Sequence, residues 1–197
     1  MPDLDKQLSF IIEIDKLKAV YRQTTVKTDN NRQENSAEHS WQITLAAQIL
    51  QDYAEHDIDI NRVVKMLLIH DIIEIDAGDL FAFAESKDHA LQAKKEEQAA
   101  QRLFGLLPAQ QYDEYKTLWF EFEAAETNDA QFAKSMDRIL PLVQNMNNQG
   151  GSWAKHKIKK SQVLARNSYL EFIAPKLWEY AVSEVDLAVA KGWLIDA

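Results

Sequence analysis

The scarcity of helix-breaking residues is the strongest constraint on the fold of this chain. Only five glycines and four prolines occur among its 197 residues. No sustained stretch alternates apolar and polar residues with the period of two that marks a half-buried strand. Alanine, leucine, glutamine, glutamate and lysine are frequent, and all five favour helices. The sequence therefore predicts an all-α fold.

Apolar periodicity divides the chain into expected helices separated by loops. The expected helices cover residues 4–20, 36–54, 61–76, 87–105, 110–126, 129–147, 161–181 and 184–192. Asn35 and Glu38 have the spacing of a capping box at the start of the second helix. Pro141 is expected to bend the sixth helix just beyond Asp137. With 46% hydrophobic residues, the chain can bury one good core, and we expect a single domain over residues 1–197.

Composition excludes several classes of site and partner. The chain has no cysteine, so a metal ion would be bound by His, Asp and Glu, and a reducing cytoplasm is the expected location. The net charge of −9 argues against binding a nucleic acid polymer, because phosphate affinity depends on clustered Lys and Arg. We expect neither a membrane span nor a signal peptide, since no apolar run is long enough and the first residues are acidic. A small phosphorylated ligand in a local basic pocket remains compatible with this composition.

Ionisable residues interrupt the most apolar of the expected helices. The stretch LLIHDIIEID contains His70, Asp71 and Glu74, which share one face because successive helical side chains are about 100° apart. An ionised Asp71 among leucines and isoleucines is costly unless it is paired or binds a cation. From this helix alone, a structural ion pair explains Asp71 as well as a metal site does.

Two other expected helices also place a polar residue among core positions. His39 lies one turn into an apolar-faced helix, and Asp137 has apolar neighbours on both sides. Taken singly, a hydrogen-bonded core histidine and a surface aspartate are the simpler interpretations. Taken with His70 and Asp71, these residues supply two imidazoles and two carboxylates from three helices. That set suits one divalent ion such as Co, Mn, Mg or Zn.

The order His39, His70–Asp71, Asp137 resembles the H…HD…D motif of the HD-domain metal-dependent phosphohydrolases. Within that superfamily, the stretches QENSAEHSW, HDIIEIDAGD and FAKSMDRI are similar to the 5′-deoxynucleotidase branch. Isoleucine at position 75 and the absence of a GYP tripeptide differ from other branches. The resemblance implies one HD-domain helical bundle, with a core motif region of about 17–147 and C-terminal helices at about 161–193. It also implies that the four motif residues bind the metal.

An activity follows from the same resemblance: hydrolysis of (deoxy)nucleoside 5′-monophosphates to nucleoside and phosphate. A divalent ion acidifies bound water and polarises phosphorus. Glu74 is a candidate to orient water or substrate, and Asp79 is the better candidate for proton transfer. Each has a structural alternative, because Glu74 could fix the tautomer of His70 and Asp79 could cap the following turn.

Two arginines before His39 are candidate phosphate ligands, Arg22 and Arg32. The family likeness places an arginine near the end of the first helix, which matches Arg22. It also places one near Arg32, seven residues before His39. Either could instead be an ordinary solvated side chain. Gln23 stands where some members have a tryptophan, so the base preference stays open.

Other functions remain compatible with these motifs. One is a phosphohydrolase acting on another small phosphorylated metabolite, and another is a non-catalytic nucleotide-binding regulatory HD protein. The presence of Glu74 and Asp79 favours the enzyme, because a pure binder has no need for a proton-transfer group. The resemblance also implies a homodimer, and apolar residues between 178 and 193 either face a second copy or close the monomer's own core. Trp153 receives no role.

Overall fold

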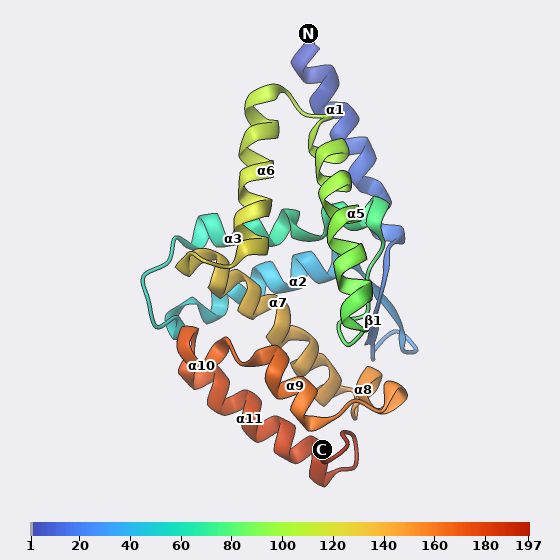
Figure 1. Cartoon of the computed structure of the whole chain (residues 1–197), viewed down its shortest axis with the longest axis vertical. Helices are drawn as coiled ribbons and strands as arrows, with labels where there is room; N and C mark the ends of the chain where they lie inside the picture. Colours follow the sequence, from blue (N-terminus) through green and yellow to red (C-terminus); the bar gives the residue numbers. More distant parts are fainter. Residues whose placement is uncertain (1) are drawn as a thin grey trace.

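A bundle of helices with one small β-hairpin makes up residues 2–197, the part of the chain that this computed structural model describes (Figure 1). The α-helices are α1 (Pro2–Ile14), α2 (Ser36–Leu50), α3 (Ile60–Ile69), α4 (Glu74–Ala77), α5 (Ser86–Phe104), α6 (Ala109–Ala124), α7 (Asn128–Asn147), α8 (Gly151–His156), α9 (Lys160–Asn167), α10 (Leu170–Ile173) and α11 (Pro175–Ala190). Short 3₁₀ helices are η1 (Asp15–Ala19), η2 (Gln51–Tyr53) and η3 (His70–Ile73), and the strands are β1 (Tyr21–Val26) and β2 (Arg32–Asn35). The predicted all-α class is confirmed, with the hairpin as its one departure in these residues.

Helix α7 is the central element of the bundle. It runs diagonally from α6 to the C-terminal helices, while α2 and α3 cross the middle of the molecule and α1, α5 and α6 extend to one end (Figure 1). Helix α7 packs against α2, α3, α6 and α9. Buried apolar side chains form one cluster that reaches from Phe10 to Leu194. A polar residue on the inner face of α7 is therefore placed near the middle of the protein.

The hairpin occupies a segment that the sequence assigned to a loop. Strands β1 and β2 pair antiparallel, with Thr25 opposite Gln33 and a register irregularity between Tyr21 and Thr25. Asn30 and Asn31 adopt positive φ angles of 51° and 57° in the turn, a conformation that asparagine tolerates better than most residues. The pattern was missed because the strands are short and only partly buried.

The capping box predicted at the start of α2 is confirmed. Asn35 Oδ1 accepts a hydrogen bond from Glu38 N at 3.0 Å, and Glu38 Oε2 accepts one from Asn35 N at 3.2 Å. These two bonds satisfy backbone donors that the first turn of a helix leaves free. They set the start of α2 directly after β2, so that His39 lies one turn into the helix.

The helix expected over residues 61–76 is interrupted at the histidine–aspartate pair. Helix α3 ends at Ile69, η3 continues through the pair as a 3₁₀ turn, and α4 closes the segment before Gly78. Gly78 has a φ of 76°, which glycine adopts without steric cost. A 3₁₀ turn rotates successive side chains by more than an α-helix does, so the predicted angular spacing of the polar residues is wrong in detail.

The C-terminal prediction of helices at 161–181 and 184–192 is also wrong in its boundaries. The chain forms α9 and α10 first, and α11 then runs without a break from Pro175 to Ala190. Pro175 explains the change, because proline cannot continue a helix but fits its first turn. Helix α8 lies inside the glycine-containing segment that was expected to be a loop.

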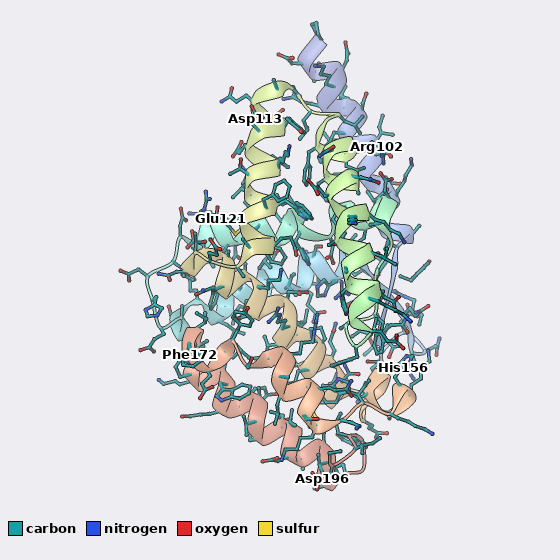
Figure 2. All side chains as sticks on the ribbon, viewed as in Figure 1. Arg102, Asp113, Glu121, His156, Phe172 and Asp196 are labelled. Atoms are coloured by element: carbon teal, nitrogen blue, oxygen red, sulfur yellow. The ribbon has the colours of Figure 1, made fainter. Side chains whose placement is uncertain are left out.

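Most apolar residues of the C-terminal segment pack into the monomer, whereas Tyr180 and Leu187 are exposed. Leu177, Val185 and Leu194 are buried, and Trp178 and Trp193 are partly buried against the same core. This favours the second of the two interpretations left open for that segment. Side chains fill the space between the helices, whereas labelled residues such as Asp113 and Asp196 lie at the periphery (Figure 2). Across residues 2–197, none of the helices has the length and apolarity of a membrane span.

Candidate functional site

Four side chains from three segments meet at the centre of the molecule. They are His39 from α2, His70 and Asp71 from η3, and Asp137 from α7. His39 Nε2 lies 2.9 Å from Asp137 Oδ1, and His70 Nε2 lies 2.9 Å from Asp71 Oδ1. Ligand atoms of His39, His70 and Asp137 all fall within 4.8 Å of one another. The fold thus brings together the four residues that the sequence predicted as a ligand set.

Neighbouring helices hold His70 in one orientation. Its Nδ1 lies 2.8 Å from the carbonyl oxygen of Leu67, and because a carbonyl only accepts, Nδ1 carries the proton. Trp119 Nε1 donates to the backbone oxygen of His70 at 3.2 Å, and the ring of Phe122 lies 5.0 Å from the imidazole. Leu67, and not Glu74, therefore fixes the tautomer of His70.

The fixed tautomer of His70 leaves its Nε2 facing carboxylates. This nitrogen is buried without a hydrogen bond, and in a neutral ring its lone pair would point at the oxygens of Asp71 and Asp137. Burial works against a charged ring, but the nearby carboxylates of Asp71 and Asp137 outweigh it and raise the pKa of His70 to about 10. The cluster therefore requires a positive charge between imidazole and carboxylates, either a proton or a metal ion.

The donor set fits a divalent metal ion. Two imidazole nitrogens and two carboxylate oxygens suit the borderline first-row ions as well as harder ones. Burial opposes ionisation of Asp137, yet its hydrogen bond with His39 and the nearby imidazole of His70 hold its pKa well below the usual range. Burial lowers the pKa of His39, which keeps that ring neutral and able to bind a metal. His39 and the ionised Asp137 are thus in the protonation states that ligation needs, whereas His70 Nε2 would give up its proton as the metal ion binds.

Arg22 lies directly over the acidic cluster. Its Nη1 donates to Asp71 Oδ2 at 2.8 Å, and its guanidinium nitrogens lie 3.9 Å from oxygens of Asp79 and Asp137. Its Nε is buried without a hydrogen bond, 3.8 Å from Glu34 Oε2. The structure therefore brings Arg22 to the pocket, where much of its charge already faces carboxylates.

Two further carboxyl groups flank the cluster with shifted acidity. Glu74 is buried and accepts a hydrogen bond from Ser36 Oγ at 2.6 Å. Burial and the charge of Asp71 raise the pKa of Glu74 well above its usual range. Burial also raises the pKa of Asp79, which follows α4 and makes no capping bond within residues 2–197. The raised pKa makes each group better able to hold a proton beside the cluster.

Arg32 is not brought to the pocket. Its guanidinium donates to both carboxylate oxygens of Glu38, at 2.9 and 2.7 Å, and also pairs with Asp29. The side chain is 41% exposed. Arg32 supports the capping box of α2 from outside, so the geometry gives no support to its predicted contact with phosphate.

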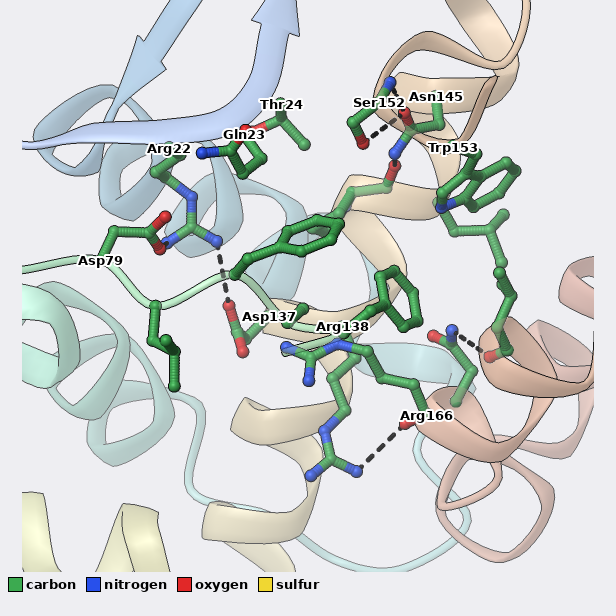
Figure 3. A pocket seen from close by; sticks show the side chains of 18 of the residues that line it. Arg22, Gln23, Thr24, Asp79, Asp137, Arg138, Asn145, Ser152, Trp153 and Arg166 are labelled. Atoms are coloured by element: carbon green, nitrogen blue, oxygen red, sulfur yellow. Dashed lines mark hydrogen bonds and ion pairs between the residues drawn. The ribbon is translucent and has the colours of Figure 1, made fainter. Parts of the chain in front are cut away.

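The acidic cluster forms one side of a cavity of about 150 Å³ (Figure 3). Several lining residues had no predicted role: Phe81, Phe83, Arg138, Asn145, Ser152, Trp153, Arg166 and Asn167. Ser152 N and Oγ donate to Asn145 Oδ1 at 2.7 and 3.0 Å, which ties α8 to α7. Trp153 is buried and forms part of the wall. Among these residues, only Arg138 could have been predicted near the site from the sequence, because it follows the predicted ligand Asp137.

Comparison with known proteins places these residues in a family context. A family model described as HD domain matches residues 14–178. A predicted metal-dependent phosphohydrolase from Magnetospirillum magnetotacticum MS-1 is 47% identical, with a TM-score of 0.92 over 98% of this chain and 96% of that one. An HD-domain phosphohydrolase from Listeria innocua has the same fold at 16% identity, with a TM-score of 0.64 over 93% of this chain and 96% of that one.

Two similar proteins carry a more specific name. The 5′-deoxynucleotidase HDDC2 of Bos taurus is 29% identical over 137 residues, which cover 70% of this chain and 65% of the bovine protein. The human protein of the same name is 28% identical over the same shares. The similarity thus spans slightly less than two thirds of the length of these relatives.

Proposed function

The chain belongs to the HD domain family, and from this premise we propose that it is a metal-dependent phosphohydrolase that removes the 5′-phosphate from (deoxy)nucleoside 5′-monophosphates. The observation that carries this proposal is the orphaned Nε2 of His70, aimed at Asp71 and Asp137 beside an open cavity. Relatives named 5′-deoxynucleotidase support the choice of substrate class.

His39, His70, Asp71 and Asp137 would hold the metal ion. A divalent ion bound there supplies an acidified water and a polarised phosphate. The protein's own contribution is to keep His70 in one tautomer through Leu67 and to keep Asp137 ionised. Asp79 borders the cavity and has a raised pKa, so it is the group we assign to proton transfer at the leaving 5′-oxygen. Glu74, held by Ser36, orients the attacking water.

A nucleoside is favoured over a small polar metabolite by the walls of the cavity. Phe81 and Phe83 line it, and their rings lie 5.5 Å apart at a steep angle. Gln23, the polar residue that follows Arg22, also lines it. Aromatic walls pack well against a base or a sugar ring. Phe81 and Phe83 therefore supply the apolar surface that Gln23 does not.

A phosphate-release screen with the purified protein tests the proposal. Nucleoside and deoxynucleoside 5′-monophosphates would be offered with Co, Mn, Mg or Zn, together with 3′-monophosphates and sugar phosphates as competing classes. We expect metal-dependent release from 5′-monophosphates above all others. Release from sugar phosphates alone would favour the other phosphohydrolase function, and metal-dependent nucleotide binding without release would favour a regulatory protein.

We also propose that two copies of the chain associate through the outer faces of α1 and α2. On α1, Ile12 is 72% exposed and Ile11 is also exposed. On α2, Trp41 is 66% exposed and Ile49 is also exposed, and Leu68 is exposed on α3. Ile11, Trp41 and Leu68 also line a shared surface groove. Large exposed apolar patches often mark protein–protein interfaces, and a dimer would bury this one. Light scattering should give twice the monomer mass, and Trp41→Glu should give the monomer.

A further inference from the structure

Arg166 is a cation without a partner in the cavity. It lies on α9, outside the core motif region of about 17–147 that the sequence indicated, and Figure 3 shows it beside Arg138 on the side of the pocket away from β1. Its guanidinium makes neither a hydrogen bond nor an ion pair with any residue in 2–197. Arg22 differs, because its guanidinium donates to Asp71 and lies near two other carboxylates. Both arginines thus face the same cavity, but only the guanidinium of Arg166 is unpaired in the described part of the chain.

The surroundings of Arg166 make its charge costly. Burial lowers the pKa of its guanidinium, and the nearby charges of Arg138 and Arg22 act in the same direction, against partial support from Asp137 and Asp79. A buried cation of this kind is stabilised when an anion enters beside it. Because the adjacent carboxylates are already used by His39, His70 and Arg22, that anion has to come from outside the chain.

The fold also holds Arg166 in place. Arg138 Nη1 donates to the backbone oxygen of Arg166 at 3.2 Å, and the Arg138 guanidinium lies 4.7 Å from the ring centre of Tyr169. The adjacent Asn167 donates to the backbone oxygen of Val163 at 2.9 Å, while its Oδ1 stays buried without a partner. Arg138 is therefore a positioning residue, and the end of α9 presents two unsatisfied polar groups at the cavity.

We propose that Arg166 binds the phosphate group of the substrate, so that the C-terminal segment completes the phosphate site. This inference rests on the proposed function and extends it to a residue outside the metal motif. A guanidinium offers a phosphate two parallel N–H donors, which makes arginine suited to this contact. The charge of Arg22 is partly neutralised by the acidic cluster, and Arg166 adds a second charge, unpaired within residues 2–197, for the phosphate dianion.

Arg166→Met is the main test, because methionine keeps an unbranched apolar stem and removes the charge. Steady-state kinetics with the metal-loaded protein should show KM for a nucleoside 5′-monophosphate and Ki for inorganic phosphate both raised about 10- to 100-fold, the range of one charge-assisted contact. Arg166→Lys should recover only part of this loss, since lysine restores the charge but not the two parallel N–H donors of a guanidinium. Metal content should stay the same in all variants.

Lys160→Ala is the matched control, because Lys160 lies on the same helix, pairs with Asp186 and does not line the cavity. It should leave KM and Ki unchanged. Wild-type kinetic constants in Arg166→Met would overturn the inference, and so would a loss of metal or a lysine variant no better than methionine.

Calorimetric titration of the metal-loaded wild type with inorganic phosphate separates the two proposals. Phosphate binding that depends on Arg166 without nucleotide turnover would overturn only the proposed activity, whereas turnover that is independent of Arg166 would overturn only this inference.

Discussion

The two sides of the cavity differ in charge and in how far the sequence reveals them. The acidic side consists of Asp71, Glu74, Asp79 and Asp137, which line the cavity, with His39 and His70 buried behind them. All six were predicted as site residues from the sequence. The cationic side consists of Arg138 and Arg166, neither of which was predicted. Carboxylates inside apolar helices attract attention because their burial is costly without compensation. Arginines are common on helix surfaces, so only the packing of α9 against α7 shows that Arg166 borders a cavity.

The largest expected effect comes from breaking the acidic side at its centre. Asp71→Ala should remove both bound metal and activity, because Asp71 faces His70 Nε2 at 2.9 Å and accepts from Arg22. Metal analysis and a phosphate-release assay would measure the two losses together. Asp76→Ala is the matched control, since Asp76 is exposed on α4 and pairs with Arg102. Stoichiometric metal in Asp71→Ala would show that the ion is bound elsewhere.

A smaller effect separates the flanking carboxyl groups from the ligand set. Glu74→Gln and Asp79→Asn should keep the metal, while the variant that lacks the true proton carrier loses about 10²- to 10⁴-fold in kcat. The raised pKa of both groups makes each a candidate. Unchanged kcat in both variants would contradict the assigned mechanism, and loss of metal from Glu74→Gln would move Glu74 into the ligand set.

Metal removal measures how much the acidic side depends on its cation. Chelation should destabilise the wild type by about 2.7 kcal/mol if metal was present at about 100 times its Kd. For a chain of this size, that corresponds to a melting temperature about 5–11 °C lower. Differential scanning calorimetry with and without chelator would show the shift. The Asp71→Ala protein should show no shift, and an equal shift in both proteins would place the stabilising ion at another site.

Substitution of Arg22 tests whether this residue, which lies between the two sides, contacts the phosphate or supports the metal ligands. Arg22→Ala removes the donor to Asp71 and one cation from the cavity, and KM for a nucleoside 5′-monophosphate should rise about 10- to 100-fold. Metal content should not fall, because Arg22 and the metal neutralise the same carboxylates. Kinetics and metal analysis on one preparation give both results. Lost metal with unchanged KM would mean that Arg22 supports the ligands and does not contact phosphate.

How much of the structure the sequence could predict depends on whether a feature is set by neighbouring residues or by tertiary contacts. The capping box of Asn35 and Glu38 was predicted correctly because its residues are three apart and its hydrogen bonds are local. The break of the helix at His70 was missed, since the 3₁₀ turn depends on tertiary contacts such as the one from Trp119. Arg166 was missed for a similar reason, because its place depends on Pro175 ending the C-terminal run early and on α9 packing beside α7.

The smallest expected effect belongs to Arg32, the predicted phosphate ligand that lies outside the cavity. Its guanidinium is already paired with Glu38 and Asp29, and exposed ion pairs of this kind contribute little to stability because water screens them. Arg32→Ala should therefore leave KM, kcat and metal content at their wild-type values, with a melting temperature close to that of the wild type. The same assays used for Arg22→Ala make the comparison direct. A rise in KM matching that of Arg22→Ala would mean that the hairpin turns Arg32 toward the substrate during binding, and phosphate would then be bound from the hairpin rather than from α9.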